Sequence, residues 1–135
     1  MREILSWIYK YDWKAIWTLS PSHPHTNALT AITVARRVLT LWEGRTGCTL
    51  GALLMAEPHP GTRIYHIHGL ISAADDFNCD EFREFSERWG QSSAQPHRPG
   101  GGFIRYITRK LLRDEVEWDL YGTFQIKEAK NVQGN

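Results

Sequence analysis

Residues 49–72, "TLGALLMAEPHPGTRIYHIHGLIS", contain two apolar runs separated by the segment "PHPGT" at 58–62. Each run is long enough for a β-strand, and proline and glycine are residues that form tight turns. The stretch therefore predicts a β-hairpin. We expect this hairpin to be part of a largely antiparallel sheet.

Helix and strand patterns alternate along the rest of the chain. Strands are expected at 14–20 and 116–126, with a short one within 91–102, and helices at the N-terminus, 79–90 and 103–114. The clearest helix starts after Thr26, the expected N-cap, and ends at Gly44; Arg36 and Arg37 point away from its apolar stripe of Ala28, Ile32, Ala35, Leu39 and Trp42. This order predicts an α+β fold, with flanking helices on a central antiparallel sheet of about five strands.

Composition limits the class of protein. The chain has 135 residues, 41% of them hydrophobic, which predicts one domain at 1–128 and a flexible C-terminal tail at 129–135. The formal net charge is +1, so any basic surface has to be local. No apolar run approaches the roughly 18 residues of a membrane span, and Glu3 and Asp12 interrupt the segment where a secretory signal would be apolar. We expect a cytoplasmic protein without membrane contact.

Two histidines stand one residue apart in the second strand of the hairpin. Alternate side chains of a strand share a face, so His66 and His68 project together. Ile64 and Leu70 flank them, and the opposite, core-facing set is Tyr65, Ile67 and Ile71. Two neutral imidazoles at this spacing can bind one divalent ion. Two surface histidines on an exposed strand face would give the same pattern.

Glu57, at the end of the first hairpin strand, is the candidate for a third ligand. Directly opposed residues of an antiparallel pair lie on the same side of the sheet. Glu57 therefore has to oppose Ile64 or His66, because opposing Arg63 or Tyr65 would aim the carboxylate at the wrong face. The alternative is a solvated charge at a strand end.

The segment 103–114 predicts a helix with a basic side. At about 100° per residue, the apolar residues Phe103, Ile104, Ile107 and Leu111 share one arc, and the opposite arc holds Arg105, Tyr106, Arg109, Lys110 and Arg113. From Arg98 to Arg113 there are five basic residues and no acidic one. Such a surface suits phosphates. A solvated helix face with one amphipathic tyrosine is the alternative.

Three segments together resemble the HUH endonucleases. "WKAIWTLSP" (13–21) resembles the first motif of this family, "YHIHGLI" (65–71) resembles its histidine pair, and "FIRYITRKLL" (103–112) resembles the helix that carries the nucleophilic tyrosine. Their order also matches. Within the family, the chain is most similar to the single-tyrosine replication initiator proteins of bacterial plasmids and phages.

The resemblance implies a fold, an activity and a set of site residues. Tyr106 would be the nucleophile that nicks single-stranded DNA, and Glu57, His66 and His68 would hold Mn²⁺ or Mg²⁺. Arg109 stands where the family usually has lysine, so whether Arg109 or Lys110 assists the tyrosine stays open. Basic side chains of the same region, Arg98, Arg105 and Arg113, would bind DNA.

The implied partner is single-stranded DNA or a hairpin origin. The chain has no GxxxxGK[ST] motif, so unwinding would come from the host or from a missing part of a longer protein. A host helicase and polymerase would be further partners. A monomer and a dimer are both compatible with the sequence. Three other functions stay open: a single-tyrosine insertion-sequence transposase, a DNA-binding module of the same fold without catalysis, and a non-haem iron enzyme.

The remaining noteworthy residues have structural interpretations. The histidines in proline-rich turns are expected to be loop residues, namely His23, His25, His59 and His97. Trp13, Trp17 and Trp42 are expected in the core, and Thr18 in the sheet beside the site, without a direct chemical role. Cys48 and Cys79 lack CxxC spacing and are expected to be reduced and partly buried.

Overall fold

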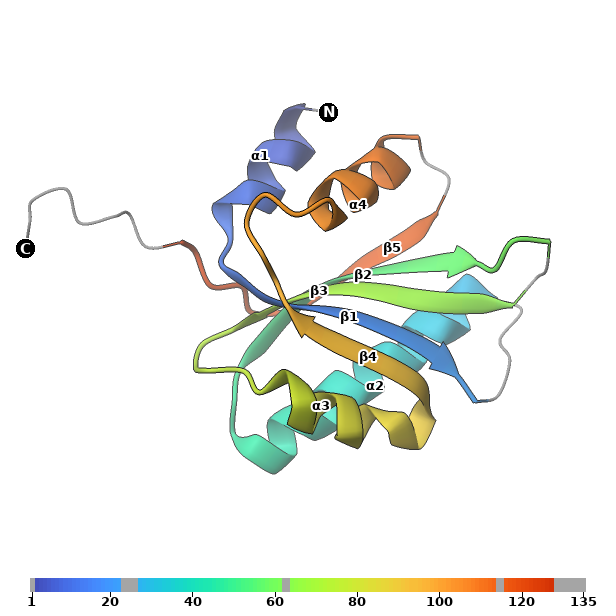
Figure 1. Ribbon diagram of the computed structural model, residues 1–135, viewed down its shortest axis with the longest axis vertical. Coiled ribbons are helices and arrows are strands. Elements are labelled where there is room, and N and C mark those ends of the chain that lie inside the picture. The colour runs from blue at the N-terminus through green and yellow to red at the C-terminus, as the bar shows by residue number, and fades with distance from the viewer. Residues whose placement is uncertain (1, 23–26, 62–63, 114–115, 128–135) are drawn as a thin grey trace, which may run out of the picture.

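The computed structural model describes residues 2–22, 27–61, 64–113 and 116–127. It contains one five-stranded antiparallel sheet with strand order β4-β1-β3-β2-β5 (Figure 1). This arrangement confirms the expected α+β class. The strands are β1 (Trp13–Pro21), β2 (Leu50–Pro58), β3 (Tyr65–Ala73), β4 (Gly90–Pro96) and β5 (Glu117–Gly122).

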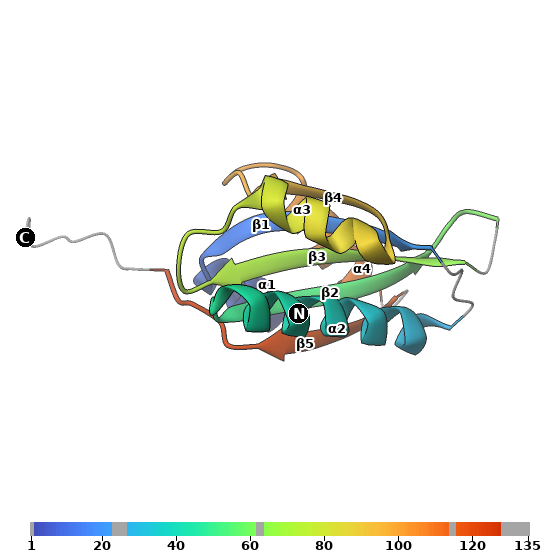
Figure 2. The ribbon, with the colours of Figure 1, turned by 90° about the horizontal axis from the view of Figure 1, so that it is seen from below.

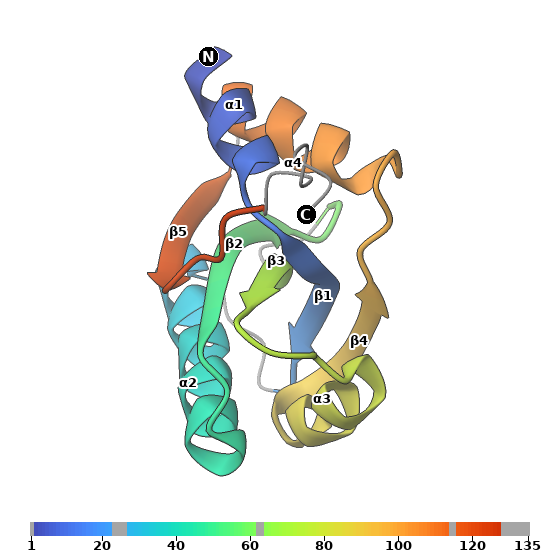
Figure 3. The same cartoon turned by 90° about the vertical axis from the view of Figure 1, so that its left-hand side faces the viewer.

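Helices cover both faces of the sheet. On one face lie α2 (Ala28–Thr46) and α3 (Cys79–Ser86), which Figure 2 shows from below, and α3 continues into the 3-10 turn η1 (Glu87–Trp89). On the other face lie α1 (Arg2–Lys10) and α4 (Phe103–Leu112) (Figure 3). We call this second side the α4 face. None of the described helices has the length and apolar character that crossing a membrane requires.

Each face of the sheet has its own apolar core. On the α2 and α3 side, Trp17, Ile67 and Phe82 are fully buried. On the α4 face, Leu70 of β3 packs in one cluster with Ile107 of α4. β3 therefore has apolar side chains on both sides, and the His66 and His68 face is a covered one rather than the solvent-exposed face of a strand. Trp13, Trp17 and Trp42 are buried as expected.

The structure corrects several predicted element ends. The N-cap of α2 is Asn27, whose side chain accepts hydrogen bonds from two backbone N–H groups; Thr26 lies outside the described residues. The helix continues through Gly44 to Thr46 because Gly47, with φ 74°, supplies the left-handed cap that ends a helix. Other elements are shorter than predicted, since α3 ends at Ser86, α4 at Leu112 and β5 at Gly122. The tail at 129–135 and the domain end at 128 lie outside the described residues.

Arg36, which was expected to point away from the apolar stripe of α2, is partly exposed and contacts β5. Its guanidinium lies 3.1 Å from the Asp119 carboxylate of β5, and 5.2 Å from the Tyr121 ring centre. The Tyr121 hydroxyl donates to Glu43 of α2 and lies 3.0 Å from Thr40 Oγ1. These contacts fix the edge strand β5 to α2. Arg37 is exposed, and the half-buried Cys48 and Cys79 are free.

Candidate active site

Strand register brings the predicted metal ligands together. β2 and β3 pair so that Glu57 lies directly opposite His66, which is one of the two registers that place the carboxylate on the histidine face. The carboxylate and the two imidazoles therefore share the α4 face. One ligand atom from each of the three side chains lies within 4.8 Å of the others.

The three ligand atoms have the spacing of a metal site. His66 Nε2 lies 2.8 Å from His68 Nε2, and the two nitrogens lie 3.5 Å and 3.4 Å from Glu57 Oε1. Ligand atoms about 2.1 Å from an ion and at right angles to each other are about 3.0 Å apart, and tetrahedral ligands are slightly farther apart. Glu57, His66 and His68 therefore form a triad that could hold a metal ion.

Burial keeps both imidazoles in the form that binds metals. Desolvation, together with the neighbouring His68 and His59, lowers the pKa of His66 to about 4. Desolvation also lowers the pKa of His68. A neutral imidazole has a free lone pair on one nitrogen, whereas the protonated ring has none. At neutral pH both rings are therefore uncharged potential ligands.

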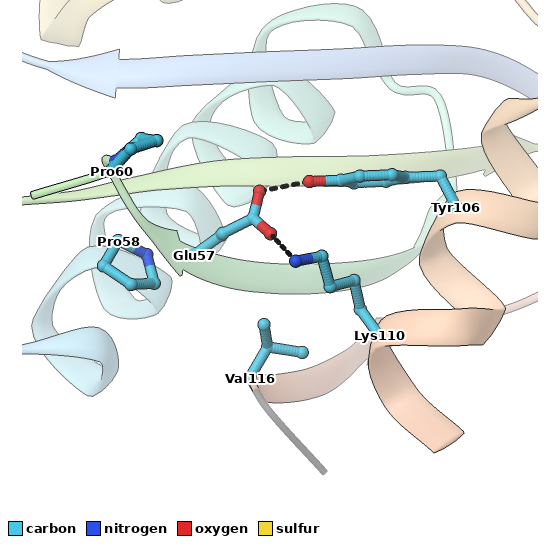
Figure 4. Close-up of a pocket in the computed structure, with 6 residues that line it drawn as sticks. All are labelled: Glu57, Pro58, Pro60, Tyr106, Lys110 and Val116. Carbon is cyan, nitrogen blue, oxygen red and sulfur yellow. Dashed lines mark hydrogen bonds and ion pairs between the residues drawn. The ribbon is translucent and has the colours of Figure 1, made fainter. Parts of the chain in front are cut away.

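Tyr106 of α4 completes the cluster. Its hydroxyl donates a hydrogen bond to Glu57 Oε1 (Figure 4), and its ring centre lies 5.8 Å from that of His68. Burial and the hydrogen bond to Glu57 raise the pKa of Tyr106 to about 12. Burial tends to raise the pKa of Glu57, but the hydrogen bonds from Tyr106 and Lys110 outweigh it and lower that pKa. The carboxyl group is therefore ionised and the phenol is neutral.

The prediction that Tyr106 and Lys110 lie on the side of α4 opposite its apolar residues is wrong. Both are half-buried and face the sheet, whereas Arg105, Arg109 and Arg113 are exposed. At about 100° per residue, Lys110 is only about 60° from the buried Ile107, so Lys110 and Tyr106 flank the apolar stripe instead of opposing it. The helix therefore presents the phenol and the ammonium to Glu57 and the three guanidinium groups to solvent.

The two candidate cations beside Tyr106 differ in their contacts. Lys110 Nζ lies 3.1 Å from Glu57 Oε2 (Figure 4) and 5.7 Å from the centre of the Tyr106 ring. The Arg109 guanidinium lies 6.0 Å from the same ring centre, and Arg109 is exposed. Arg98, in the connection between β4 and α4, is exposed as well. The structure therefore brings Lys110 into the centre and leaves Arg98, Arg105 and Arg113 on the surface.

Two further residues lie beside the triad: His59, which was expected to be a loop residue, and Thr18, which was expected in the sheet beside the site. The His59 ring centre lies 4.2 Å from that of His66, and Thr18 Oγ1 lies 3.3 Å from His68 Nδ1. The signal for His59 was available, because it follows Glu57 by two positions and so continues the same face. Thr18 lies beside the site as expected, but its contact with His68 was not predicted, because that contact depends on the pairing of β1 with β3.

The cluster opens into a pocket of about 300 Å³. Its lining consists of Glu57, Pro58, Pro60, Tyr106, Lys110 and Val116 (Figure 4). The carboxylate, phenol and ammonium groups are therefore accessible to a ligand. No family model, curated protein or solved structure matches this chain.

Proposed function

We propose that this protein is a metal-dependent endonuclease of the HUH type, which nicks and rejoins single-stranded DNA through a covalent phosphotyrosine. One observation carries the proposal. The hydroxyl of Tyr106, from α4, is hydrogen-bonded to the Glu57 carboxylate of β2, whose Oε1 lies 3.5 Å and 3.4 Å from the imidazole nitrogens of His66 and His68 on β3. A nucleophile and three metal-ligand atoms beside one pocket suit phosphoryl transfer, and the five-stranded antiparallel sheet is compatible with the HUH fold.

The proposed reaction conserves the energy of the phosphodiester bond. The Tyr106 oxygen attacks a backbone phosphorus and forms a 5′-phosphotyrosine bond, while the bond from phosphorus to the 3′ oxygen breaks. The 3′ oxygen takes up a proton and leaves as a free hydroxyl group, which can prime synthesis or attack the phosphotyrosine to rejoin the strand. No net hydrolysis is required for this exchange.

Activation of the phenol is the main requirement, because a neutral tyrosine is a weak nucleophile. Glu57 Oε1 already accepts the hydrogen bond of the phenol and is therefore the nearest acceptor for its proton. Mn²⁺ or Mg²⁺ bound by Glu57, His66 and His68 would polarise the scissile phosphate. The two imidazoles favour Mn²⁺ more than an all-oxygen site would.

The cations have separate proposed roles. Lys110, in contact with Glu57 and close to the Tyr106 ring, would stabilise negative charge on the phenol oxygen and the phosphate. The exposed Arg98, Arg105 and Arg113 would bind backbone phosphates along the strand. The substrate would be single-stranded DNA or a hairpin origin in the cytoplasm, with helicase and polymerase supplied by the host.

A covalent trapping experiment tests the proposal. Labelled single-stranded oligonucleotides are incubated with the protein and Mn²⁺, and adducts are resolved on a denaturing gel. Tyr106→Phe and a chelator should each abolish the adduct, and Tyr9→Phe should not, because Tyr9 is an exposed residue of α1. Tight DNA binding without any adduct would instead indicate a binding module. Rejoining of hairpin-flanked strands would favour transposition over replication initiation.

A further inference from the structure

The two imidazoles of the triad differ in what their second ring nitrogen contacts. His68 Nδ1 lies 3.3 Å from Thr18 Oγ1. His66 Nδ1 is buried, and among the described residues it has no hydrogen-bond partner. Histidines that bind metals usually donate the other ring N–H to an acceptor, which fixes the tautomer and the ring orientation. Only the His68 side of the site shows such an arrangement in the described chain.

The sheet holds the Thr18 hydroxyl in place. Thr18 lies directly opposite His68 in the pairing of β1 with β3, and opposite Ser93 in the pairing of β1 with β4. β1 is therefore hydrogen-bonded on both sides. A β-branched side chain on such a strand has few accessible rotamers. The position of Oγ1 relative to His68 is thus set by the fold and not by a mobile loop.

For a His68 ring that binds a metal through Nε2, counting protons gives the direction of its hydrogen bond to Thr18. A neutral imidazole carries one N–H group, so a ring that binds a metal through Nε2 must carry its proton on Nδ1. A threonine hydroxyl can accept a hydrogen bond from that Nδ1–H group. The 2.8 Å contact between the two Nε2 atoms needs one donor, and with the His68 proton on Nδ1 the donor is His66 Nε2–H.

We infer that Thr18 is a positioning residue for the proposed metal site: its hydroxyl accepts from His68 Nδ1–H and so leaves His68 Nε2 unprotonated for the ion. The inference rests on the proposed function for the identity of the ligand. His68 then already has the metal-binding tautomer in the metal-free protein. His66, which holds its proton on Nε2 in the metal-free protein, moves that proton to Nδ1 when it binds.

Nitrogen NMR of the metal-free protein tests the tautomer directly, because long-range proton couplings distinguish Nδ1–H from Nε2–H rings. Wild type and Thr18→Ser should show His68 as the Nδ1–H form and His66 as the Nε2–H form. Thr18→Val, which keeps the side-chain shape without the hydroxyl, should show a mixture at His68. A His68 ring with its proton on Nε2 in the wild-type protein would overturn the inference.

Calorimetric titration with Mn²⁺ tests the consequence. Thr18→Val should weaken Mn²⁺ binding about 10- to 100-fold, the usual effect of losing such a partner, and Thr18→Ser should restore it. Thr33→Val, which removes a hydroxyl from an exposed position of α2, is the matched control. Thermal unfolding of each variant shows whether the sheet still forms.

The outcomes separate the two proposals. Absence of Mn²⁺ binding by the wild-type protein would contradict the proposed metal site, while the NMR experiment would still test the role of Thr18. Wild-type affinity in a folded Thr18→Val variant would contradict the inference alone. Weak binding by both Thr18→Val and Thr18→Ser would also contradict it, because a serine hydroxyl can accept the same hydrogen bond.

Discussion

Replacing Lys110 with methionine is expected to slow formation of the DNA adduct about 100-fold, and the same change at Arg109 only about threefold. The two cations are at similar distances from the phenol ring, 5.7 Å for Lys110 Nζ and 6.0 Å for the Arg109 guanidinium. Distance alone therefore predicts equal effects. The expected effects differ because water screens the two charges to different extents. Arg109 is exposed, whereas the Lys110 side chain is 28% exposed and paired with Glu57.

Coulomb's law gives the size of the two effects on a phenolate. At an effective dielectric constant of about 20, a unit charge at the distance of Lys110 stabilises the phenolate by about 2.9 kcal/mol. In bulk water a unit charge at the distance of Arg109 stabilises it by about 0.7 kcal/mol. Each 1.36 kcal/mol changes a rate about tenfold. These energies correspond to adduct formation that is about 100-fold slower without the Lys110 charge and about threefold slower without the Arg109 charge.

Single-turnover kinetics at saturating Mn²⁺ measure the effect without contributions from product release. Lys110→Arg is the charge-preserving control and should retain most of the rate. Thermal unfolding of each variant checks that loss of the ion pair with Glu57 has not unfolded the site. If Arg109→Met slows the adduct as much as Lys110→Met, the assignment of the assisting cation to Lys110 is wrong.

Three further results are expected. Mn²⁺ at a hundred times its Kd should stabilise the protein by about 2.7 kcal/mol, which raises Tm by about 10 °C. In a thermal melt His66→Ala should lose this shift in Tm, and the control His97→Ala should keep it. Equal shifts in the two variants would argue against the metal triad. Arg105→Gln should weaken binding of single-stranded DNA and reduce the salt slope by about 0.7, and fluorescence anisotropy showing an unchanged slope would remove Arg105 from the DNA surface. Burial and the hydrogen bond to Glu43 raise the pKa of Tyr121, so the stability due to its phenol proton is complete below about pH 10 and decreases as pH rises toward the folded-state value. In urea titrations Tyr121→Phe should lose about 1 kcal/mol at pH 7 and show a smaller alkaline decline, and an identical decline would contradict this role.

The sequence predicted what depends on short-range periodicity. Alternation along 65–71 put His66 and His68 on one face. The same alternation identified the two registers that bring Glu57 to that face, and the structure has one of them. The cover over this face was missed although β2 contains a signal for it. Residues 50–56, "LGALLMA", contain no polar side chain, and such a run without alternation is typical of a strand covered on both sides. All seven of these residues are buried in the structure.

The rest depended on contacts between distant segments. Thr18 lies beside His68 only because β1 occupies the position next to β3 in the sheet, and local sequence does not specify strand order. Tyr106 and Lys110 were expected on the outer side of α4 because the prediction divided the residues of this helix between only two arcs, one apolar and one polar. Residues at the border of an apolar stripe face whatever the packing angle of the helix brings near them, which here is Glu57.

The pairing of Glu57 with His66 also constrains how this protein can vary in evolution. A single residue inserted between His66 and His68 would put the two imidazoles on opposite faces of the sheet, because the side chains of a strand alternate between its faces. An insertion between Pro58 and Tyr65 lengthens only the connection and leaves the paired positions in place. Length differences among natural homologues should therefore accumulate in that connection, while the distance in sequence from Tyr65 to His68 stays constant.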